Sequence, residues 1–567
     1  MTSTFSKILT KLKKRHIIET LAAFIGGGWL LLEFVHWILV DHYHFPEKSI
    51  DITFITILGA LLCTVIWRWF GGRERPGKLK PERFLVPLVA LITLGLDMNL
   101  LFHLKEPGAE PPPASRWKNS VAVLPFVDMS PMKDQESFCD GITEDLINRL
   151  SNIKDLKVPA RTSVFTFKGK TPEPREVGEK LKVQTMIEGS VQKAGNRLRI
   201  TAQLINIADG YHLWSEKYDR EPRDLFDIQD DISSAIANAL RLELTSKERG
   251  DLTRRGTTNP VAFELYFKGK QFRYKERPRE LLLAKACFEE AAQRDPNYAA
   301  AYAGLAENYM VLGLLSVLPR DEAADEARLA TRRALKIAPD SSEAHVSSGV
   351  VKMVFDWDWK GAEREFKDAI ALNPNNFDAH REYALLLVRN YRFDESEREF
   401  LRSIELDPLN GLPLRDLQSV YLGQGRADKA EEAKKRLAEI DPYWARWTTG
   451  FDLTVEEVEK DISERGRNIW SLIWLAAANY KLGITEEAAK IIKDVENLYE
   501  VGQGNVAYGL ATYYCEMRQD RDRTLMWLER AVEGRAPALI NVSRNPCFDF
   551  LLKETRFQEV LRRVGLK

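Results

Sequence analysis

Short motifs that could do chemistry occur in this sequence, but each lacks a part that the chemistry needs. Gly169-Lys170-Thr171 matches the end of a phosphate-binding loop, in which backbone N–H groups and a lysine hold the phosphate. That loop also needs a glycine five residues before Gly169, where this chain has Val164. The Ser-x-x-Lys motif of some hydrolases occurs without its companion motifs, at Ser130, Ser151 and Ser190. We therefore predict no catalytic residue and no cofactor-binding residue.

Histidines and cysteines give no stronger signal for chemistry. His42 and His44 alternate in a short segment between two apolar runs and could contribute to a metal site. Two histidine ligands are usually too few to hold a metal ion, so we predict no metal site. Cys515 and Cys547 lie close enough in the sequence to pair, and a disulfide and two ordinary buried thiols both stay open as alternatives.

The strongest pattern in the chain is a period of prolines that would end helices. Intervals of 43, 35, 34 and 34 residues separate Pro296, Pro339, Pro374, Pro408 and Pro442. A tetratricopeptide repeat, which is a pair of helices, has 34 residues. Alanines lie 5 and 12 residues before Pro374 and before Pro296, and a phenylalanine lies 8 residues before each. Small residues allow close helix packing, and proline ends a helix because it lacks an N–H group.

The period defines the second half of the chain. After Pro296, the residues Tyr302, Leu305 and Tyr309 recur at helical spacing, as expected for the first helix of a repeat. We predict about seven repeats over residues 260–534, which form an all-α solenoid. Residues 535–567 are predicted to cap it.

A solenoid of this kind offers an extended concave surface to other proteins or peptides. In the predicted register, the first helices place five polar or basic candidates for partner binding on that groove: Asn308, Lys352, His380, Arg381 and Arg415. Their mixed polar and basic character suits a peptide with some acidic character. The alternative is that these residues are only solvated helix faces.

Length and charge set outer limits on the function. At 567 residues the chain is too long for a single core, so two or three domains are expected. The formal net charge is −1, without the basic balance that is typical of proteins that bind nucleic acid. We therefore predict no nucleic-acid partner.

The first 104 residues contain three apolar runs, at 17–40, 50–70 and 84–104. Each run is long enough to cross a bilayer as a helix, so the sequence predicts a membrane domain of three helices with the lipid bilayer as a partner. The runs also contain three ionisable residues that either have a function or only join the helices by hydrogen bonds: Glu33, His36 and Asp97.

Basic residues predict how this membrane domain would be oriented. The segments before the first run and between the second and third carry ten lysines and arginines, and the segments on the other side carry four. An excess of lysine and arginine marks the cytoplasmic side of a membrane. We therefore predict a multi-pass protein of a bacterial inner membrane, with a cytoplasmic N-terminus and with residues 105–567 in the periplasm.

The segment between the apolar runs and the repeats divides into two parts. Residues 105–117, which include Pro111-Pro112-Pro113, are typical of a semi-rigid linker. Residues 118–245 show mixed strand and helix patterns. The clearest of them is a hairpin of strands 187–191 and 198–205, in which apolar and polar residues alternate along the second strand.

Four stretches of this α/β region carry a resemblance to a known family: SVAVLPFVDMSPMKDQESFCDGITEDLINRLSNI, ARTSVFTFKGK, IEGSVQKAGNRLRITAQLINIADGYHLWSEKYDR and DLFDIQDDI. They resemble the TolB-like amino-terminal domain, which is related to the FlgO family and implies a small α/β fold. Such domains commonly precede tetratricopeptide arrays in bacterial membrane proteins. Some relatives carry a winged-helix, kinase or nucleotide-cyclase domain at the N-terminus, where this chain shows only the apolar runs. The resemblance offers no catalytic residues to carry over.

The sequence as a whole predicts a multidomain protein with three transmembrane helices, a TolB-like α/β domain and a tetratricopeptide solenoid. We expect a membrane-anchored, non-catalytic interaction scaffold that binds proteins or peptides outside the cytoplasm, and no enzyme. The alternative is a transmembrane signalling component, which would relay a periplasmic binding event to a cytoplasmic partner.

Overall fold

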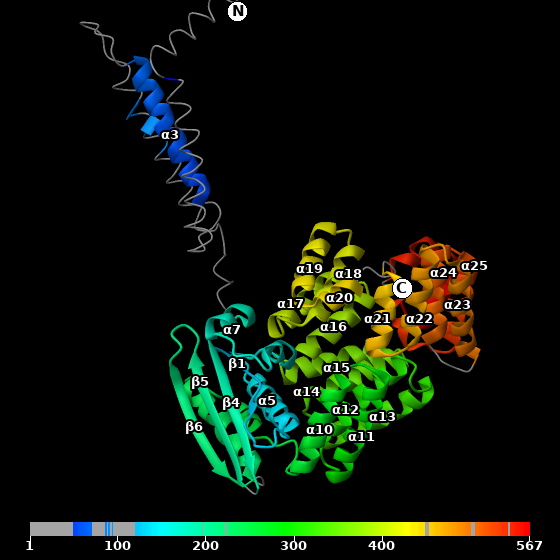
Figure 1. The fold of residues 1–567 in the computed structure, drawn as a ribbon. Helices are drawn as coiled ribbons and strands as arrows, with labels where there is room; N and C mark the ends of the chain where they lie inside the picture. Colours follow the sequence, from blue (N-terminus) through cyan, green and yellow to red (C-terminus); the bar gives the residue numbers. More distant parts are fainter. Residues whose placement is uncertain are drawn as a thin grey trace, which may run out of the picture. The chain divides into compact units, whose positions relative to one another are not determined.

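The computed structural model describes residue 17, residues 49–70, residues 86, 87, 89, 90 and 93, and the ranges 119–195, 197–221, 224–447, 453–500, 505–542 and 545–566. The chain divides into two compact units, Met1–Arg116 and Trp117–Lys567. The second unit consists of a small α/β domain followed by an all-α array of the tetratricopeptide type (Figure 1).

In the first unit, helix α3 (Ser49–Phe70) coincides with the apolar run at 50–70. Among the residues that the structure describes, no helix combines the length and the apolar character needed to cross a membrane. The other two predicted spans, 17–40 and 84–104, fall almost entirely outside the described residues. The polar residues singled out in or beside the runs also lie outside them: Glu33, His36, His42, His44 and Asp97.

A mixed β-sheet forms the centre of the α/β domain. The strand order is β3-β1-β4-β5-β6, and the short β2 also pairs with β4. Strand β1 runs parallel to β3 and β4, and β2 runs parallel to β4, whereas β4, β5 and β6 are antiparallel neighbours. The strands are β1 (Asn119–Val123), β2 (Val127–Asp128), β3 (Leu156–Lys157), β4 (Thr185–Ala194), β5 (Arg197–Asn206) and β6 (His212–Arg220).

The hairpin of β4 and β5 confirms the alternating pattern seen in the sequence. Gly195 in its turn has a φ of 58°, a left-handed conformation that glycine adopts without steric cost. On β5, every second side chain points into the core, as a strand with one buried face requires. These buried residues are Leu198, Ile200, Ala202 and Leu204.

Helix α5 (Glu136–Ser151) lies between the sheet and the first helix of the array (Figure 1). Ile142, Leu146 and Leu150 are fully buried, because residues four apart share one face of a helix. The other helices of the domain are α6 (Arg161–Val164), α7 (Pro174–Leu181), α8 (Leu225–Ala239) and α9 (Ser246–Leu252).

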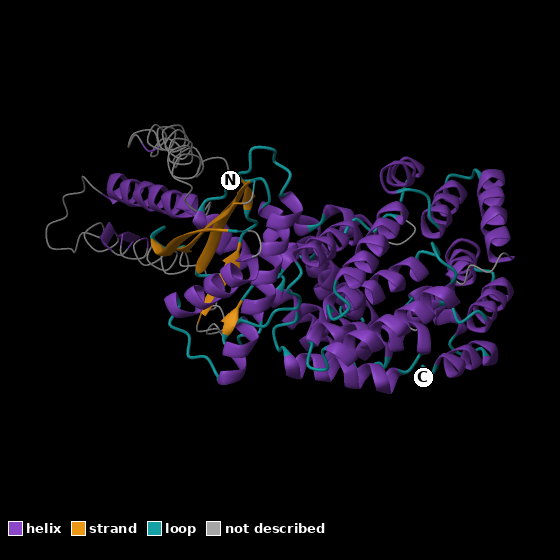
Figure 2. Cartoon of the chain, turned by 90° about the horizontal axis from the view of Figure 1, so that it is seen from below, coloured by secondary structure: helices purple, strands orange, loops and turns teal. Residues whose placement is uncertain are grey.

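Seven helix pairs form the array within the described residues, at the end of the unit away from the orange strands of Figure 2. The pairs are α10 (Pro260–Arg273) with α11 (Pro278–Arg294), α12 (Ala299–Leu314) with α13 (Arg320–Ile337), α14 (Ser342–Val351) with α15 (Trp359–Leu372), α16 (Phe377–Arg389) with α17 (Phe393–Leu406), α18 (Gly411–Gly423) with α19 (Ala427–Ile440), α22 (Ile469–Lys481) with α23 (Thr485–Glu500), and α24 (Asn505–Arg518) with α25 (Arg521–Glu533). Two short helices, α20 (Pro442–Trp447) and α21 (Val455–Arg465), separate the fifth pair from the sixth.

The phenylalanine of the repeat pattern packs against glycine in a neighbouring helix. Phe366 of α15 is fully buried, and a Cβ atom added to Gly349 of α14 would lie 2.5 Å from its ring. Phe288 of α11 has the same relation to Gly304 of α12, at 2.9 Å. The small residue and the aromatic ring therefore fit together, which explains why the period is visible in the sequence.

The end of the array contacts its early helices. The amide of Asn505 in α24 donates to the carbonyl oxygens of Gly313 and Leu314, at 3.2 and 2.6 Å. The indole N–H of Trp359 donates to the carbonyl oxygen of Val564 at 2.9 Å. Val564 ends helix α26 (Thr555–Val564), which follows two 3₁₀ helices, Pro537–Asn541 and Pro546–Leu551. The array thus closes on itself.

Candidate functional site

Three of the five residues predicted to line the groove are occupied by contacts within the array. Asn308 is fully buried and its amide donates to the carbonyl oxygen of Leu281 at 3.0 Å, so it does not face a groove. Lys352 forms an ion pair with Glu365. The Nδ1 atom of His380 lies 2.6 Å from a carboxylate oxygen of Glu399.

The structure brings the other two together around one carboxylate. Arg381 and Arg415 contact the buried Asp416, at 2.9 and 3.0 Å. The guanidinium of Arg415 also stacks on Trp444, 4.6 Å from a ring centroid. The basic charge that suggested an acidic peptide is thus already paired inside the array.

The segment that follows α5 is docked against the turns between the repeats. Asn375, in the turn before α16, is buried, and its amide donates to the carbonyl oxygens of Ser151, Ile153 and Leu156, at 3.0, 2.9 and 3.3 Å. Its own amide oxygen accepts a hydrogen bond from Arg402 at 3.1 Å. One side chain of the array therefore fixes the backbone of a six-residue stretch of the α/β domain.

The next turn of the array caps the short helix α6. The fully buried carboxylate of Asp407 accepts hydrogen bonds from the backbone N–H and the hydroxyl of Ser163, at 3.0 and 2.5 Å. Ser163 is the third residue of α6, whose N–H has no acceptor within the helix, so Asp407 acts as a cap supplied by another domain. Burial raises the pKa of the Asp407 carboxyl, and the bonds from Ser163 and Asn410 oppose the rise.

A buried ion cluster joins α5 to α10. Glu144 is 3% exposed and pairs with Lys270 and with Arg161, the latter at 3.0 Å. The guanidinium of Arg161 lies 3.9 Å from the ring centroid of Phe165 and 4.3 Å from that of Tyr274. Two cations offset the cost of burying one carboxylate, so this contact also holds the two domains in one arrangement.

Lys157 at the end of β3 is buried where α7 ends. Its ammonium group donates to the carbonyl oxygens of Leu181 and Lys182, at 3.1 and 3.2 Å. Burial lowers the pKa of Lys157 to about 8, and the nearby Glu405 opposes this fall.

This lowered pKa predicts a dependence of stability on pH. Between about pH 8 and the usual lysine pKa of 10.5, the unfolded chain binds more protons at this position than the folded chain. The contribution of Lys157 to the free energy of unfolding should therefore rise across that window. Urea denaturation should show that the free energy of unfolding of the parent, relative to that of the Lys157→Met variant, is higher at pH 10 than at pH 7. An equal difference at both pH values would contradict the prediction, and Lys170→Met, at an exposed position, serves as the control.

The motifs that suggested chemistry do not assemble into a site. The exposed Gly169 and Lys170 follow a 3₁₀ turn over Phe165–Phe167, and Val164 is fully buried. Cys515 and Cys547 are both free, and the Cys515 thiol donates to the Cys547 carbonyl oxygen at 2.6 Å. In the part of the chain that the structure describes, no group of three or more histidine, cysteine, aspartate or glutamate side chains could hold a metal ion.

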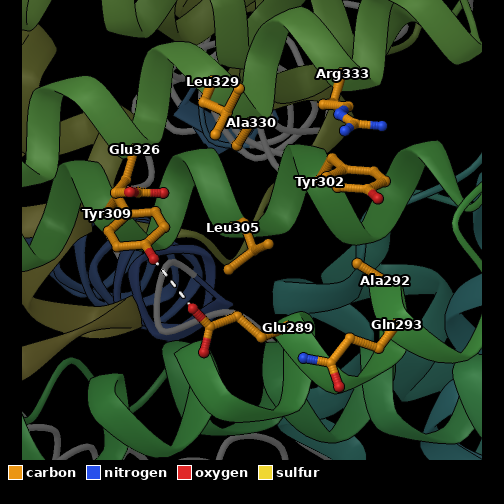
Figure 3. A pocket seen from close by; sticks show the side chains of 10 residues that line it. All are labelled: Glu289, Ala292, Gln293, Tyr302, Leu305, Tyr309, Glu326, Leu329, Ala330 and Arg333. Atoms are coloured by element: carbon orange, nitrogen blue, oxygen red, sulfur yellow. Dashed lines mark hydrogen bonds between the residues drawn. The ribbon is translucent and has the colours of Figure 1, made fainter.

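A cavity of about 320 Å³ lies between α11, α12 and α13 (Figure 3). Tyr302, Leu305 and Tyr309 of α12 line it, together with Glu289 of α11 and with Glu326 of α13. The Tyr309 hydroxyl donates to Glu289 at 3.2 Å. Burial and the charge of Glu289 raise the pKa of Tyr309.

The sequence did not reveal this pocket as a site. The three α12 residues were recognised only as a helical pattern of the repeat, and the two glutamates carried no signal of their own. A comparison of charges between equivalent helix pairs could have singled them out.

Comparison with known proteins gives two partial matches, one to a family model and one to a relative. The family model described as HilA/YgeH-like transcriptional regulator, second domain, matches residues 117–235. The protein named "Putative adenylate cyclase 3" of Rhizobium meliloti (strain 1021) is 44% identical over 197 residues. That match covers 35% of this chain and 34% of the relative, so the chain spans about a third of the relative's length.

Solved structures with similar helix pairs include YrrB, described as a tetratricopeptide protein with an unusual peptide-binding site. It is 22% identical, with a TM-score of 0.23, and the match covers 32% of this chain and 87% of YrrB. PilW, a type IV pilus biogenesis factor, is 18% identical, with a TM-score of 0.27, and the match covers 42% of this chain and 94% of PilW.

These matches correct three predictions made from the sequence. The TolB-like assignment is wrong, because the family model that matches residues 117–235 is the HilA/YgeH-like one. The membrane-anchored, non-catalytic scaffold and the statement that the protein is no enzyme are contradicted by the match to a domain of transcriptional regulators and by the similarity to a putative adenylate cyclase. The tetratricopeptide character of the array stands, and such an array indicates binding of a peptide or a protein.

Proposed function

We propose that this chain is a regulatory protein in which the helical array binds a peptide or protein and the α/β domain carries the effect of that binding. The similarity of residues 117–235 to a domain of transcriptional regulators supports a regulatory role. The Rhizobium meliloti relative, named for a cyclase that would make a second messenger, points in the same direction.

The observation that carries this proposal is the buried junction between the two domains. Asn375 and Asp407 lie in turns between helix pairs, where a change in the packing of neighbouring repeats would move them. Each holds backbone groups of the segment that contains Ser151 and Ser163. A shift in the array therefore has a direct mechanical route to the sheet, through contacts that can be altered one at a time.

Cells that lack the chain provide the test. We expect the deletion to change a defined set of transcripts or the level of cyclic AMP, and the parent chain to restore it. Ser163→Ala removes two hydrogen bonds of the hydroxyl at the junction, one donated to Asp407 and one accepted from the Leu409 N–H. The variant should restore the response only in part, at equal protein abundance. Ser246→Ala, at an exposed serine, should restore it fully. Unchanged transcripts and cyclic AMP in the deletion strain would contradict a regulatory role.

Adenylate cyclase activity is the second candidate function, favoured by the 44% identity to the Rhizobium meliloti relative. The purified chain would be incubated with ATP and magnesium, and cyclic AMP would be measured against a heat-inactivated sample. Formation above that blank would support the activity in this chain. Its absence would count against the cyclase candidate and would leave the regulatory proposal standing.

The location expected from the sequence, an inner-membrane protein with residues 105–567 outside the cytoplasm, stays a prediction. A reporter that is active only in the periplasm should give signal when fused after Pro113 and none when fused after Gly77, because of the ten-to-four distribution of basic residues. The reverse pattern would place the α/β domain and the array in the cytoplasm.

A further inference from the structure

Hydrogen bonds between a tyrosine and a glutamate recur along the array. In each case, the hydroxyl of a tyrosine in a first helix donates to a glutamate in the preceding second helix. The four bonds are Tyr309 to Glu289 at 3.2 Å, Tyr383 to Glu363 at 3.1 Å, Tyr421 to Glu397 at 3.0 Å and Tyr514 to Glu496 at 3.1 Å.

In three of these places the chain supplies an arginine from the start of the next second helix. The contacts are Arg392 to Glu363 at 2.8 Å, Arg426 to Glu397 at 2.6 Å and Arg523 to the hydroxyl of Tyr514 at 3.1 Å. Burial alone would raise the pKa of Glu363, but the bonds from Lys367, Arg392 and Tyr383 hold it at about 2. The guanidinium is therefore a regular component of these tyrosine–glutamate pairs.

The pair at the pocket of Figure 3 is different. Among the described residues, Glu289 contacts Lys285 at 2.8 Å and Tyr309, and no arginine of α13 reaches it. Helix α13 instead places Glu326 beside Tyr309 (Figure 3). Within the same described residues, Glu326 forms no hydrogen bond or ion pair. The pocket thus has a second carboxylate, as the Tyr383 place has in Glu395. Among the described residues it lacks an arginine that bonds to both glutamates, as Arg392 does at Tyr383.

We propose that this pocket binds the side chain of an arginine in the peptide or protein partner. The guanidinium lies between Glu289 and Glu326, beside the ring of Tyr309, in the role that Arg392 and Arg426 have in the later repeats. The aliphatic part of the side chain lies on Leu305 and on the partly exposed Leu329. This inference rests on the proposed function, because it names the chemistry of the partner that the array binds.

The size and shape of the pocket fit this occupant. A volume of about 320 Å³ is at the lower end of the range for ligand pockets, which suits a single side chain. A planar guanidinium can bond to two carboxylates and stack on an aromatic ring at the same time. The chain shows that stacking elsewhere, with Arg426 4.8 Å from the ring centroid of Tyr421 and Arg523 5.1 Å from that of Tyr514.

Arg333 makes the two ends of the pocket differ in charge. It lies at the end beside Tyr302, away from Glu326 (Figure 3). A second basic residue of the partner would be repelled at that end. A single arginine, and not a basic run, is therefore the chemistry that the pocket selects.

The test uses the purified full chain and a fluorescein-labelled heptapeptide of glycine and serine with one central arginine. A second peptide carries citrulline at that place, which has nearly the same shape and no charge. Fluorescence anisotropy should show the arginine peptide binding about tenfold more tightly, because a charge-assisted bond to a carboxylate is lost in the citrulline peptide.

Two variants assign the effect to the pocket. Glu326→Gln keeps the side-chain shape and should reduce binding of the arginine peptide to the citrulline level, with an unchanged unfolding midpoint. Glu431→Gln, at an exposed position on α19, should leave binding as in the parent. Equal affinity for the two peptides, or an unchanged preference in Glu326→Gln, would overturn the inference.

The outcomes separate this inference from the proposed function. If the parent shows no preference for arginine while the deletion strain shows a clear transcript or cyclic AMP response, arginine binding at the pocket is contradicted and the regulatory role is supported. If the parent prefers the arginine peptide while the deletion strain shows no response, the binding site is supported and the regulatory role is contradicted.

Discussion

Replacing Phe366 with alanine is expected to lower the free energy of unfolding by about 3–5 kcal/mol. The ring is fully buried in α15, and it fills the space that Gly349 leaves in α14. Glycine has no side chain that could move into the cavity, and neighbouring repeats hold both helices in place. The site therefore has little ability to collapse, which places the cost in the upper part of the range for such substitutions.

Urea denaturation of the full chain, followed by circular dichroism, would measure this loss. Phe550→Ala is a matched control, since that phenylalanine is 49% exposed and its loss should cost much less. A loss below about 1 kcal/mol in Phe366→Ala would show that the ring is not the packing element that the repeat pattern indicates.

Replacing Asn375 with alanine should loosen the α/β domain from the array. The change removes the donor for the carbonyl oxygens of Ser151, Ile153 and Leu156, and it leaves Arg402 without the Asn375 oxygen. Each buried polar group that loses its partner costs about 1–3 kcal/mol. We expect a lower unfolding midpoint and faster proteolysis within residues 151–163.

Asn297→Ala is the control for this change. Asn297 follows Pro296 as Asn375 follows Pro374, but its side chain is exposed. The two variants therefore differ in the contact with the α/β domain and share their place in the repeat. Equal proteolysis of both variants would contradict a role for Asn375 in holding the domains together.

The parts of this structure that the sequence predicted depend on neighbours in the chain. Helix pairs follow from the 34-residue period, and the hairpin of β4 and β5 follows from alternation along one strand. The prediction that Asn308 faces the groove was wrong, because on a first helix the concave face and the face toward the adjacent repeat differ by only one residue position, or about 100°.

The contacts between domains could not be predicted from the sequence. Ser163 and Asp407 are 244 residues apart, and neither has a neighbour in the chain that marks it as an interface residue. The pocket was missed for a related reason. Glu326 matters because, among the described residues, no arginine bonds to it. A comparison of charges between helix pairs could have singled it out, but its place beside Tyr309 and Glu289 is visible only in three dimensions.

The closure of the array has a consequence for how such a chain can evolve. Repeat proteins commonly gain or lose units by gene duplication, since each repeat contacts only its neighbours and the ends are free to move. Here the bond from Asn505 to Gly313 and the bond from Trp359 to Val564 join positions 192 and 205 residues apart. An inserted repeat would separate both pairs by the width of a helix pair. Lineages that keep both bonds are therefore expected to keep the number of repeats constant between residues 313 and 564, and to vary in length before that interval.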